Sequence, residues 1–510
     1  MNQHRTRFLS NALLLSAVNI AMRGLAVSFN AYVHDKIGTE SMGLLTLVMS
    51  VYGFAVTLAL SCVNLGALKL TSERCAQLDE ADAASWKYAM RQVIRSVCRY
   101  SLLFGIGSGL LLWIFSEPIA RYLLRDMRTL LSLRVLAVSL PAISLSSGLS
   151  GYFTGLRKVT KNAIVAVSEQ FIKIIGTSAA LVMLAPGNVE ASCLAVVGGS
   201  AVAEGLSLVI HLILYLFDSG RPAGQKPGKR SVRLKTGFRD TAAISFPSAV
   251  GTYARQGLTT LEHLAIPAGL TKSGLTQAAA LSSYGALQGI ALPLVMFPYA
   301  VIGSFTTLLI PEMSELNEIG NRENIDRLTR EVYKFLALFS MAACGIFINY
   351  AGPLGELIYH SSEAARYTFL LGLLVPFMYL DTAVDSLLKG LGEQVYIMKV
   401  NIADAASGLL LVMLFTPLFG IYGYLLTVWI CEIGNLALSI YKLGQTTGCG
   451  VRQAIRYYVK PAAACAVMSV VRLLLLSHFD PIPSMLIFAG GYLLLTTPIM
   501  KTKKERPMKP

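Results

Sequence analysis

The sequence predicts an all-α integral membrane protein with about fourteen transmembrane helices, arranged as two related six-helix lobes followed by two C-terminal helices. Three observations predict this class. Hydrophobic residues make up 54% of the chain and charged residues 14%, which with a mean hydropathy of +0.58 is too apolar for a soluble protein of this size. Long apolar segments recur along the whole chain. Several polar motifs occur twice, once in each half.

Fourteen apolar segments are each long enough to cross about 30 Å of hydrocarbon. The first is preceded by Arg5 and Arg7, as in a signal peptide, but it has full membrane length and no small-residue cleavage motif follows it, so we interpret it as an uncleaved helix. Pro293 and Pro298 are expected to bend the eighth segment. The predicted spans are 11–33, 41–65, 93–115, 129–149, 163–185, 193–217, 241–264, 278–310, 332–351, 367–388, 397–415, 421–441, 459–476 and 484–499.

Lysine and arginine alternate between the connecting segments, as expected when cations stay on the cytoplasmic side. With a cytoplasmic N-terminus, the inner segments carry most of these cations and the outer segments carry only Lys36, Arg121, Arg125, Arg128 and Lys272. A multi-pass protein of the plasma membrane with both termini cytoplasmic is therefore predicted. Because this topology explains the net charge of +15, we expect no nucleic-acid partner.

The eight cysteines form no CxxC pair, and no histidine lies near them at metal-ligand spacing. We expect free thiols packed between helices, no metal site of that kind and no cofactor. His211 and His263 are isolated in the sequence, and packing is the predicted role of each. Gly105 and Gly109 lie within the third apolar segment, where close helix packing is the predicted role.

The sequence motif Ser-Ala-Val-x4-Arg occurs in the first and the seventh apolar segments. It ends at Arg23 in the first and, 232 positions later, at Arg255 in the seventh. In the seventh segment the polar residues follow each other at steps of three and four, which places them on one helical face. Such a face is unfavourable in hydrocarbon unless it meets protein or water. One alternative is that these residues only hold the helices together, with Arg255 paired to Glu262. We predict a central cavity whose substrate-binding residues are Arg23, Arg255, Asn19, Asn30, Thr252 and Thr259.

Further motifs that occur in both halves of the chain support a duplication. Gly155 and Gly390 follow the fourth and tenth segments, and fourteen residues beyond each glycine stands a carboxylate, Glu169 or Asp404. In the sixth and twelfth segments the same spacings of three and seven relate two triplets, which are Glu204, Ser207 and His211 in one and Glu432, Asn435 and Ser439 in the other.

The duplication predicts the organisation of the chain. Because six helices per half is an even number, both halves enter the membrane from the same side, and the cleft between them is the expected transport path. The basic tail could contact anionic lipids, although a solvated end is the favoured interpretation. The predicted parts are an N-lobe at 1–217, a basic cytoplasmic linker at 218–240, a C-lobe at 241–441, two helices within 442–500 and the cytoplasmic tail at 501–510.

Embedded carboxylates are the other candidates for function. Asp381 and Asp385 lie one turn apart in the tenth segment, with Lys389 one turn further on. They form either a charge-neutralising ladder or an oxygen-rich site for a proton or a sodium ion, and the spacing does not choose between these. The ion-coupling candidates are Glu262, Asp381, Asp385, Asn401, Asp404, Glu169, Glu204 and Glu432.

The chain contains no Walker, HExxH or GxSxG motif and no long soluble segment for nucleotide chemistry. We therefore predict a transporter and not an enzyme. Without an ATPase in the chain, transport has to be driven by a gradient or by the membrane potential.

Several motifs of the second half resemble those of one known family. They are Leu292-Pro293-Leu294-Val295-Met296-Phe297-Pro298, Leu309-Ile310-Pro311-Glu312-Met313, Leu387-Leu388-Lys389-Gly390-Leu391-Gly392-Glu393-Gln394 and Gly420-Ile421-Tyr422-Gly423. These motifs are similar to those of the stage V sporulation protein B-like polysaccharide exporters. That family belongs to the multidrug, oligosaccharidyl-lipid and polysaccharide flippase superfamily, as do the lipid II flippases, whose fourteen helices are similar to the number predicted here.

The resemblance implies a flippase that carries an undecaprenyl-diphosphate-linked saccharide to the outer leaflet of a bacterial membrane, for cell-wall, spore-cortex or polysaccharide synthesis. It implies that Arg23 is placed like the cavity arginines of lipid II flippases, which bind the diphosphate. The corresponding second arginine of that family lies on the eighth helix, whereas Arg255 lies on the seventh, and Glu262 stands where relatives often have aspartate. Besides the lipid-linked saccharide, the expected partners are membrane lipids, a proton or sodium ion, and cell-wall or spore-cortex synthesis enzymes.

Two other functions remain open at this stage. A multidrug extruder would use the embedded acids to bind cationic compounds, and paired cavity arginines argue against cationic cargo. A noncatalytic membrane scaffold of a cell-wall synthesis complex would use the charges only to join helices, and would tolerate their neutralisation.

Overall fold

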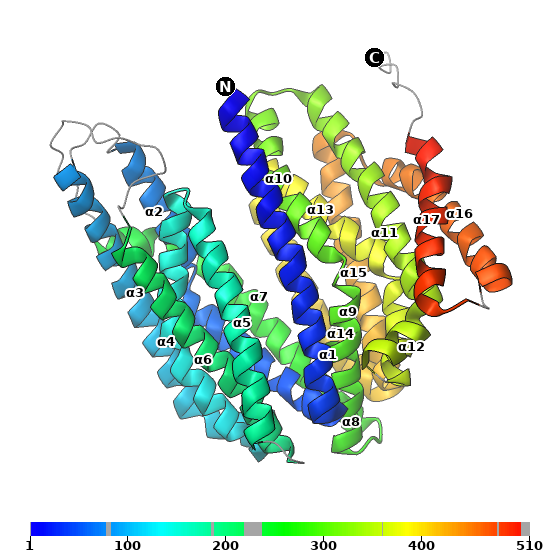
Figure 1. The fold of residues 1–510 in the computed structure, drawn as a ribbon, viewed down its shortest axis with the longest axis horizontal. Helices are drawn as coiled ribbons and strands as arrows, with labels where there is room; N and C mark the ends of the chain where they lie inside the picture. The colour runs from blue at the N-terminus through cyan, green and yellow to red at the C-terminus, as the bar shows by residue number, and fades with distance from the viewer. Residues whose placement is uncertain are drawn as a thin grey trace. The chain divides into compact units, whose positions relative to one another are not determined.

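The computed structural model describes residues 2–77, 83–184, 188–218, 237–359, 361–476 and 479–500, and throughout these ranges the ordered elements are helices, with no strands (Figure 1). Ten of the described helices are long and apolar enough to cross a membrane, or eleven if the bent pair Ser362–Gly372 and Val375–Gly390 forms one span. The predicted all-α membrane class is confirmed. The number fourteen is consistent with the structure but is not fixed by it.

Every predicted span falls on one or more helices. Helix breaks interrupt three of the predicted spans, 41–65, 278–310 and 367–388. The helices are α1 Asn2–Leu60, α2 Val63–Gln77, α3 Ala83–Pro118, α4 Leu130–Gly155, α5 Val159–Leu184, α6 Val189–Leu216, α7 Phe238–Lys272, α8 Gln277–Tyr284, α9 Leu292–Val295, α10 Tyr299–Glu318, α11 Arg322–Tyr359, α12 Ser362–Gly372, α13 Val375–Gly390, α14 Gln394–Phe419, α15 Ile421–Thr447, α16 Val451–Val471 and α17 Pro481–Met500.

The predicted continuous span at 278–310 is broken in the structure. After α8 the chain makes a π-helical stretch at Gly285–Ala291, then α9, and a turn at 296–298 separates α9 from α10. Pro298 is the last residue of that turn, and its ring lacks the N–H needed to continue a preceding helix. The span at 367–388 is likewise divided between α12 and α13, which meet at 54°, just before Pro376.

The helices gather into two compact units. Unit 1 consists of residues 1–35, 269–275 and 283–510, and unit 2 of residues 36–268 and 276–282. The boundary near residue 35 lies beside Gly38, whose φ of 77° kinks α1 because only glycine adopts this conformation freely. The units are groups of packed helices, whereas the predicted lobes are stretches of repeated sequence, so the lobe boundaries stay a prediction. Most of the predicted linker and the whole predicted tail, 219–236 and 501–510, lie outside the described residues.

Close backbone packing builds unit 2, in which α3, α4, α5 and α6 lie side by side (Figure 1). A Cβ added to Gly105 would lie 2.9 Å from Cα of Pro141, and one added to Gly109 would lie 2.8 Å from the carbonyl oxygen of Ala137. The two glycines therefore let α3 approach the backbone of α4, as small residues do between membrane helices. The predicted packing role of this glycine run is confirmed.

Contacts at the two ends of unit 2 agree with the predicted sides of the membrane. At one end Lys158 forms an ion pair with Asp218 at 2.7 Å, and both come from segments predicted to be inside. At the other end Arg128 forms an ion pair with Glu40 at 3.2 Å, and both come from segments predicted to be outside. The connections that the charge alternation groups together thus lie at the same end of this unit.

Unit 1 shows the same separation. Glu393 and Lys442, from two predicted inner segments, form an ion pair at 2.9 Å. Cys449, from the second of these segments, accepts a hydrogen bond on its carbonyl oxygen from Tyr333 Oη at 3.0 Å. Burial raises the pKa of the Cys449 thiol to about 11, so this group stays protonated at neutral pH.

The duplication is visible in the local structure after α4 and after α13. A Cβ on Gly155 would lie 2.9 Å from the carbonyl oxygen of Leu68 in α2, and one on Gly390 would lie 3.0 Å from that of Ile310 in α10. Both glycines thus allow a helix crossing of the same kind. The residues that follow these glycines, Leu156 and Leu391, both have φ −79° and ψ 1°. The next residues both have positive φ, 59° for Arg157 and 86° for Gly392.

We predict that Gly155→Ala destabilises the protein, because the new methyl group has no room against the Leu68 carbonyl oxygen and the Thr71 side chain. Overpacking of this kind costs about 1–3 kcal/mol, which a thermal unfolding scan in detergent would detect as a lower Tm. Gly205→Ala in α6 is the matched control, since nothing lies within 4 Å of its Cβ position. Equal Tm values for the two variants would contradict the proposed helix crossing.

Candidate functional site

The two predicted cavity arginines lie in different units, and each is described within its own. Arg23 is exposed on the first half of α1, on the same helix as the half-buried Asn30; the side chain of Asn19 lies outside the described residues. Arg255 is exposed on α7. Within unit 2, the described residues give Arg255 no ion pair, so the alternative in which Glu262 neutralises it is not observed. Whether the arginines share one site stays a prediction.

The hydroxyl groups predicted beside Arg255 bond to their own helix. Thr259 Oγ1 donates to the Arg255 carbonyl oxygen at 3.1 Å, and Thr252 Oγ1 donates to the Ser248 carbonyl oxygen at 3.1 Å. Each hydroxyl oxygen still has acceptor capacity. The guanidinium of Arg255 is therefore the main donor on this exposed face of α7.

Unit 1 gathers the predicted carboxylates of α13, α14 and α15 into one cluster, which we call the carboxylate cluster. Asp385, Asp404 and Glu432 all lie within electrostatic range of Asp381, and so does the ammonium group of Lys389. Four acids around one lysine are strongly repulsive when all are ionised in a low-dielectric interior. The cluster is consequently an arrangement that favours uptake of a proton or another cation.

Hydrogen bonds from α15 hold the two aspartates of α13. Asn435 Nδ2 donates to Asp381 Oδ2 at 3.2 Å, and Ser439 Oγ donates to Asp385 Oδ1 at 3.3 Å. Asp381 is only 8% exposed, and its second oxygen has no hydrogen-bond partner among the described residues. Asn401 Nδ2 donates a hydrogen bond to the Ile397 carbonyl oxygen at 2.9 Å. The structure thus shows Asn401 bonded to its own helix and not to these acids.

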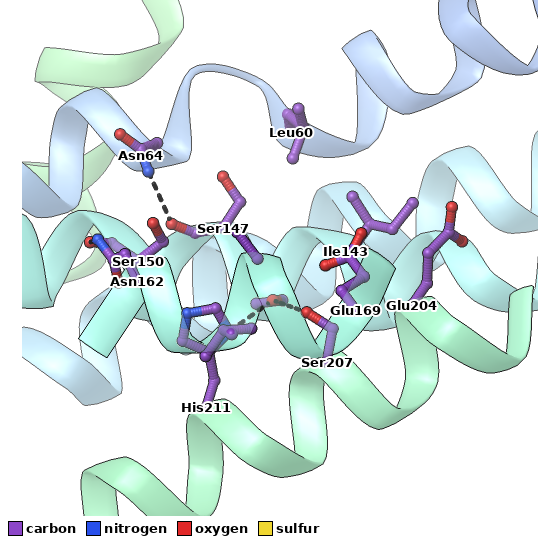
Figure 2. A pocket seen from close by; sticks show the side chains of 13 residues that line it. Leu60, Asn64, Ile143, Ser147, Ser150, Asn162, Glu169, Glu204, Ser207 and His211 are labelled. Carbon is purple, nitrogen blue, oxygen red and sulfur yellow. Dashed lines mark hydrogen bonds between the residues drawn. The ribbon is translucent and has the colours of Figure 1, made fainter. Parts of the chain in front are cut away.

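Of the other three candidates, Glu262 is half-buried on α7, and Glu169 and Glu204 line a cavity in unit 2 (Figure 2). Its volume is about 310 Å³ and its walls come from α1, α2, α4, α5 and α6. Because most of its side chains are polar, it can hold several water molecules within the membrane span. The lining residues are Leu60, Asn64, Ile143, Ser146, Ser147, Ser150, Asn162, Val165, Ala166, Glu169, Glu204, Ser207 and His211.

Sequence reasoning missed the residue that holds Glu204. Tyr52 Oη donates to Glu204 Oε2 at 2.7 Å and also bonds Ser139 Oγ at 2.7 Å. Tyr52 lies in an apolar run, where tyrosine is ordinary, and only the tertiary structure brings it to the acid. A buried tyrosine in a membrane segment needs a hydrogen-bond partner, and that requirement is the one signal that could have drawn attention to it.

His211 has a second role beyond the predicted packing. Its ring stacks on Phe153 with the centroids 6.2 Å apart, which agrees with packing. Its Nδ1, however, is 2.8 Å from Ser146 Oγ, and the side chain lines the cavity. His263, half-buried on α7, is outside this group.

The polar groups of the two units occupy matching positions. Ser146 and Asp381 stand at the same distance before the repeated glycines Gly155 and Gly390. Each is bonded from the next-but-one apolar helix, Ser146 by Ser207 at 3.3 Å and Asp381 by Asn435 at 3.2 Å. The repeat therefore preserves the side-chain contact, and it exchanges a hydroxyl for a carboxylate.

All eight cysteines are free, as predicted. No group of three or more histidine, cysteine, aspartate or glutamate side chains in the described ranges is arranged to bind a metal ion.

Comparisons with known proteins agree with this architecture. A family model described as polysaccharide biosynthesis protein matches residues 8–317. The chain is 24% identical over 424 residues to stage V sporulation protein B of Bacillus subtilis, covering 82% of this chain and 80% of that protein. It is 25% identical to sporulation protein YkvU of the same organism over 255 residues, which is 50% of this chain and 56% of that one.

Solved structures share the fold. The lipid II flippase MurJ in an inward closed conformation superposes with a TM-score of 0.66 at 15% identity, covering 97% of this chain and 99% of that one. An inward-facing multidrug resistance transporter of the MATE family gives a TM-score of 0.61 at 13% identity, covering 86% and 100%. Both are multi-pass membrane transporters, so the predicted transporter fold is confirmed.

We predict that Tyr52→Phe lowers the Tm, because Glu204 and Ser139 then lose a shared partner inside the protein. Leaving a buried polar group without its hydrogen bond costs about 1–3 kcal/mol. Tyr122→Phe is the matched control, since Tyr122 is 72% exposed. An unchanged Tm for Tyr52→Phe would show that the hydroxyl does not hold Glu204.

Proposed function

The chain belongs to the polysaccharide biosynthesis protein family, and we propose that it is a flippase that moves an undecaprenyl-diphosphate-linked saccharide from the inner to the outer leaflet of the bacterial cell membrane. The main support is the exposed position of Arg23 and Arg255 on helices of a transporter fold. In this proposal both termini are cytoplasmic, and the exported saccharide supplies cell-wall, spore-cortex or polysaccharide synthesis enzymes.

The chemistry of arginine supports a diphosphate as the group that is bound. A guanidinium in a membrane segment is costly and needs an anion or water beside it. Arg255 has no acidic partner among the described residues of its unit, which leaves its donors available to cargo. The planar fork of a guanidinium bonds two phosphate oxygens at once, whereas an ammonium acts as a point charge.

The membrane potential can drive export of such a cargo. Each negative charge gains roughly 2.3 kcal/mol per 100 mV when it moves toward a positive exterior. A diphosphate with about two charges would therefore gain enough for net export, and no nucleotide hydrolysis is needed. The carboxylate cluster of unit 1 would add coupling to a proton or sodium ion.

A multidrug extruder is the second candidate, because the fold is shared with a MATE transporter and the carboxylate cluster could bind cations. The exposed arginines favour anionic cargo instead. A scaffold without transport is the third candidate, and it predicts that neutralising the charges has no effect beyond stability.

We predict that Arg23→Lys and Arg255→Lys each reduce flipping about tenfold, because a charge remains but the bidentate fork is lost. The measurement is translocation of a labelled undecaprenyl-diphosphate saccharide in proteoliposomes with an imposed potential. Arg327→Lys is the control, since Arg327 is exposed and pairs with Glu331 in the same helix at 3.4 Å. Normal flipping by both lysine variants would contradict the diphosphate role, and dye efflux without lipid flipping would favour the extruder.

We predict that Asp381→Asn removes the response of flipping to proton or sodium gradients and keeps the response to potential. The amide has the shape of a protonated aspartate and cannot ionise, so the carboxylate cluster loses one charge permanently. The rates are compared under each gradient separately. Asp480→Asn, at an exposed residue before α17, is the control. An unchanged gradient response in Asp381→Asn would exclude this aspartate from coupling.

A further inference from the structure

The cavity of unit 2 lies beside a break in a membrane helix. Between α1 and α2, Ser61 and Cys62 have φ values of 44° and 55°, which are unfavourable for residues other than glycine. Strained backbone of this kind persists only where the surroundings hold it, and it gathers at functional sites. Leu60 and Asn64, on either side of the break, both line the cavity.

Two tyrosines hold the break in place. Tyr100 Oη is 3.0 Å from Ser61 Oγ and donates to the Ser61 carbonyl oxygen at 3.0 Å. The hydroxyl of Tyr253, from α7, also bonds Ser61 Oγ. Discontinuous helices within a bilayer are tolerated where they border a cavity and are typical of ion sites in transporters. The helix break is thus an integral part of the cavity wall.

Three ionisable side chains line this cavity at different points. Glu169 from α5 and Glu204 and His211 from α6 all line it, as Figure 2 shows. His211 is only 4% exposed; its Nδ1 bonds Ser146, and its Nε2 has no hydrogen-bond partner among the described residues. An imidazole nitrogen without a hydrogen-bond partner can accept a proton.

We propose that this cavity is a proton-binding site in which Glu169, Glu204 and His211 take up and release a proton during the transport cycle. The inference rests on the proposed transport function and adds a second ion site, separate from the carboxylate cluster of unit 1. Chains of glutamate and histidine that face water inside a membrane protein are the usual components of proton relays.

The neighbours of the cavity favour a proton over a metal cation. Sodium and other hard cations need several oxygen ligands around one point, whereas His211 presents a nitrogen. The other ionisable groups facing Glu204 are Tyr52 of α1, which donates to it, and Lys173 of α5, which is within electrostatic range. The described part of α4 contributes serine hydroxyls to the wall.

The size and the connections of the cavity separate it from cargo binding. At about 310 Å³ it is at the lower limit for a drug-sized ligand, and a lipid-linked saccharide is larger. A hydrogen-bonded row instead links its wall, with Ser146 Oγ 3.3 Å from Ser207 Oγ and 2.8 Å from His211 Nδ1. Hydroxyl groups can both donate and accept, so this row can pass a proton along α4 and α6.

The first test measures flipping in proteoliposomes at zero potential, with the pH varied between about 4 and 8, a range that includes the ordinary pKa values of glutamate and histidine side chains. We expect the wild-type rate to change about tenfold across this range and the rate of His211→Gln and Glu204→Gln to change less than about twofold. Glu190→Gln is the control, because Glu190 lies in the first turn of α6 and does not line the cavity. A wild-type pH profile in both variants, or a dependence on sodium and not on pH, would overturn the proposal.

A second measurement keeps the proposal separate from the proposed function. The Tm of the purified protein is followed over the same pH range in detergent, where no lipid cargo is required. We expect a pH-dependent Tm in the wild type that is lost in His211→Gln and in Glu169→Gln. If no lipid is flipped by any variant but this difference is present, the proposed cargo is wrong and the proton site stands. If the Tm profiles coincide, the proton site is wrong.

Discussion

A charged side chain within a bilayer is stable only where it meets protein, water or a counter-charge, and both units of this molecule are organised around that constraint. In unit 1 the buried Asp381 is held by Asn435, and in unit 2 Glu204 is held by Tyr52. The apolar surface of a membrane helix gives little preference for one neighbour over another. The polar contacts therefore help to decide which faces of the helices meet, as between α13 and α15 and between α1 and α6.

The duplication preserved geometry more strictly than chemistry. At the end of unit 2 Lys158 pairs with Asp218, and at the end of unit 1 Glu393, at the position matching Lys158, pairs with Lys442. The signs of the charges are exchanged and the ion pair remains. Gly155 cannot be exchanged in this way, because its place in the helix crossing leaves no room for a side chain.

The sequence was sufficient for features that depend on composition and local spacing. The apolar segments and the grouping of the connections at each end of a unit could be predicted, since each is a property of the chain itself. The break at Ser61 and Cys62 could not, because neither residue favours positive φ and the conformation depends on tyrosines from two other helices. For the same reason the sequence predicted only packing for His211, since its place in the cavity wall depends on the four other helices that build the cavity.

The two units also act as internal controls for each other. Ser146 and Ser150 in α4 occupy the positions of Asp381 and Asp385 in α13, and α4 still packs against α6 through hydroxyl contacts. A carboxylate is therefore not required at these positions to join the helices. Placing the buried Asp381 and the half-buried Asp385 beside further acids is electrostatically unfavourable, and the repeat shows that a neutral solution to the same packing exists in this chain. Packing alone therefore does not explain the carboxylates of unit 1, which is consistent with the proposed role of this cluster in binding a proton or sodium ion.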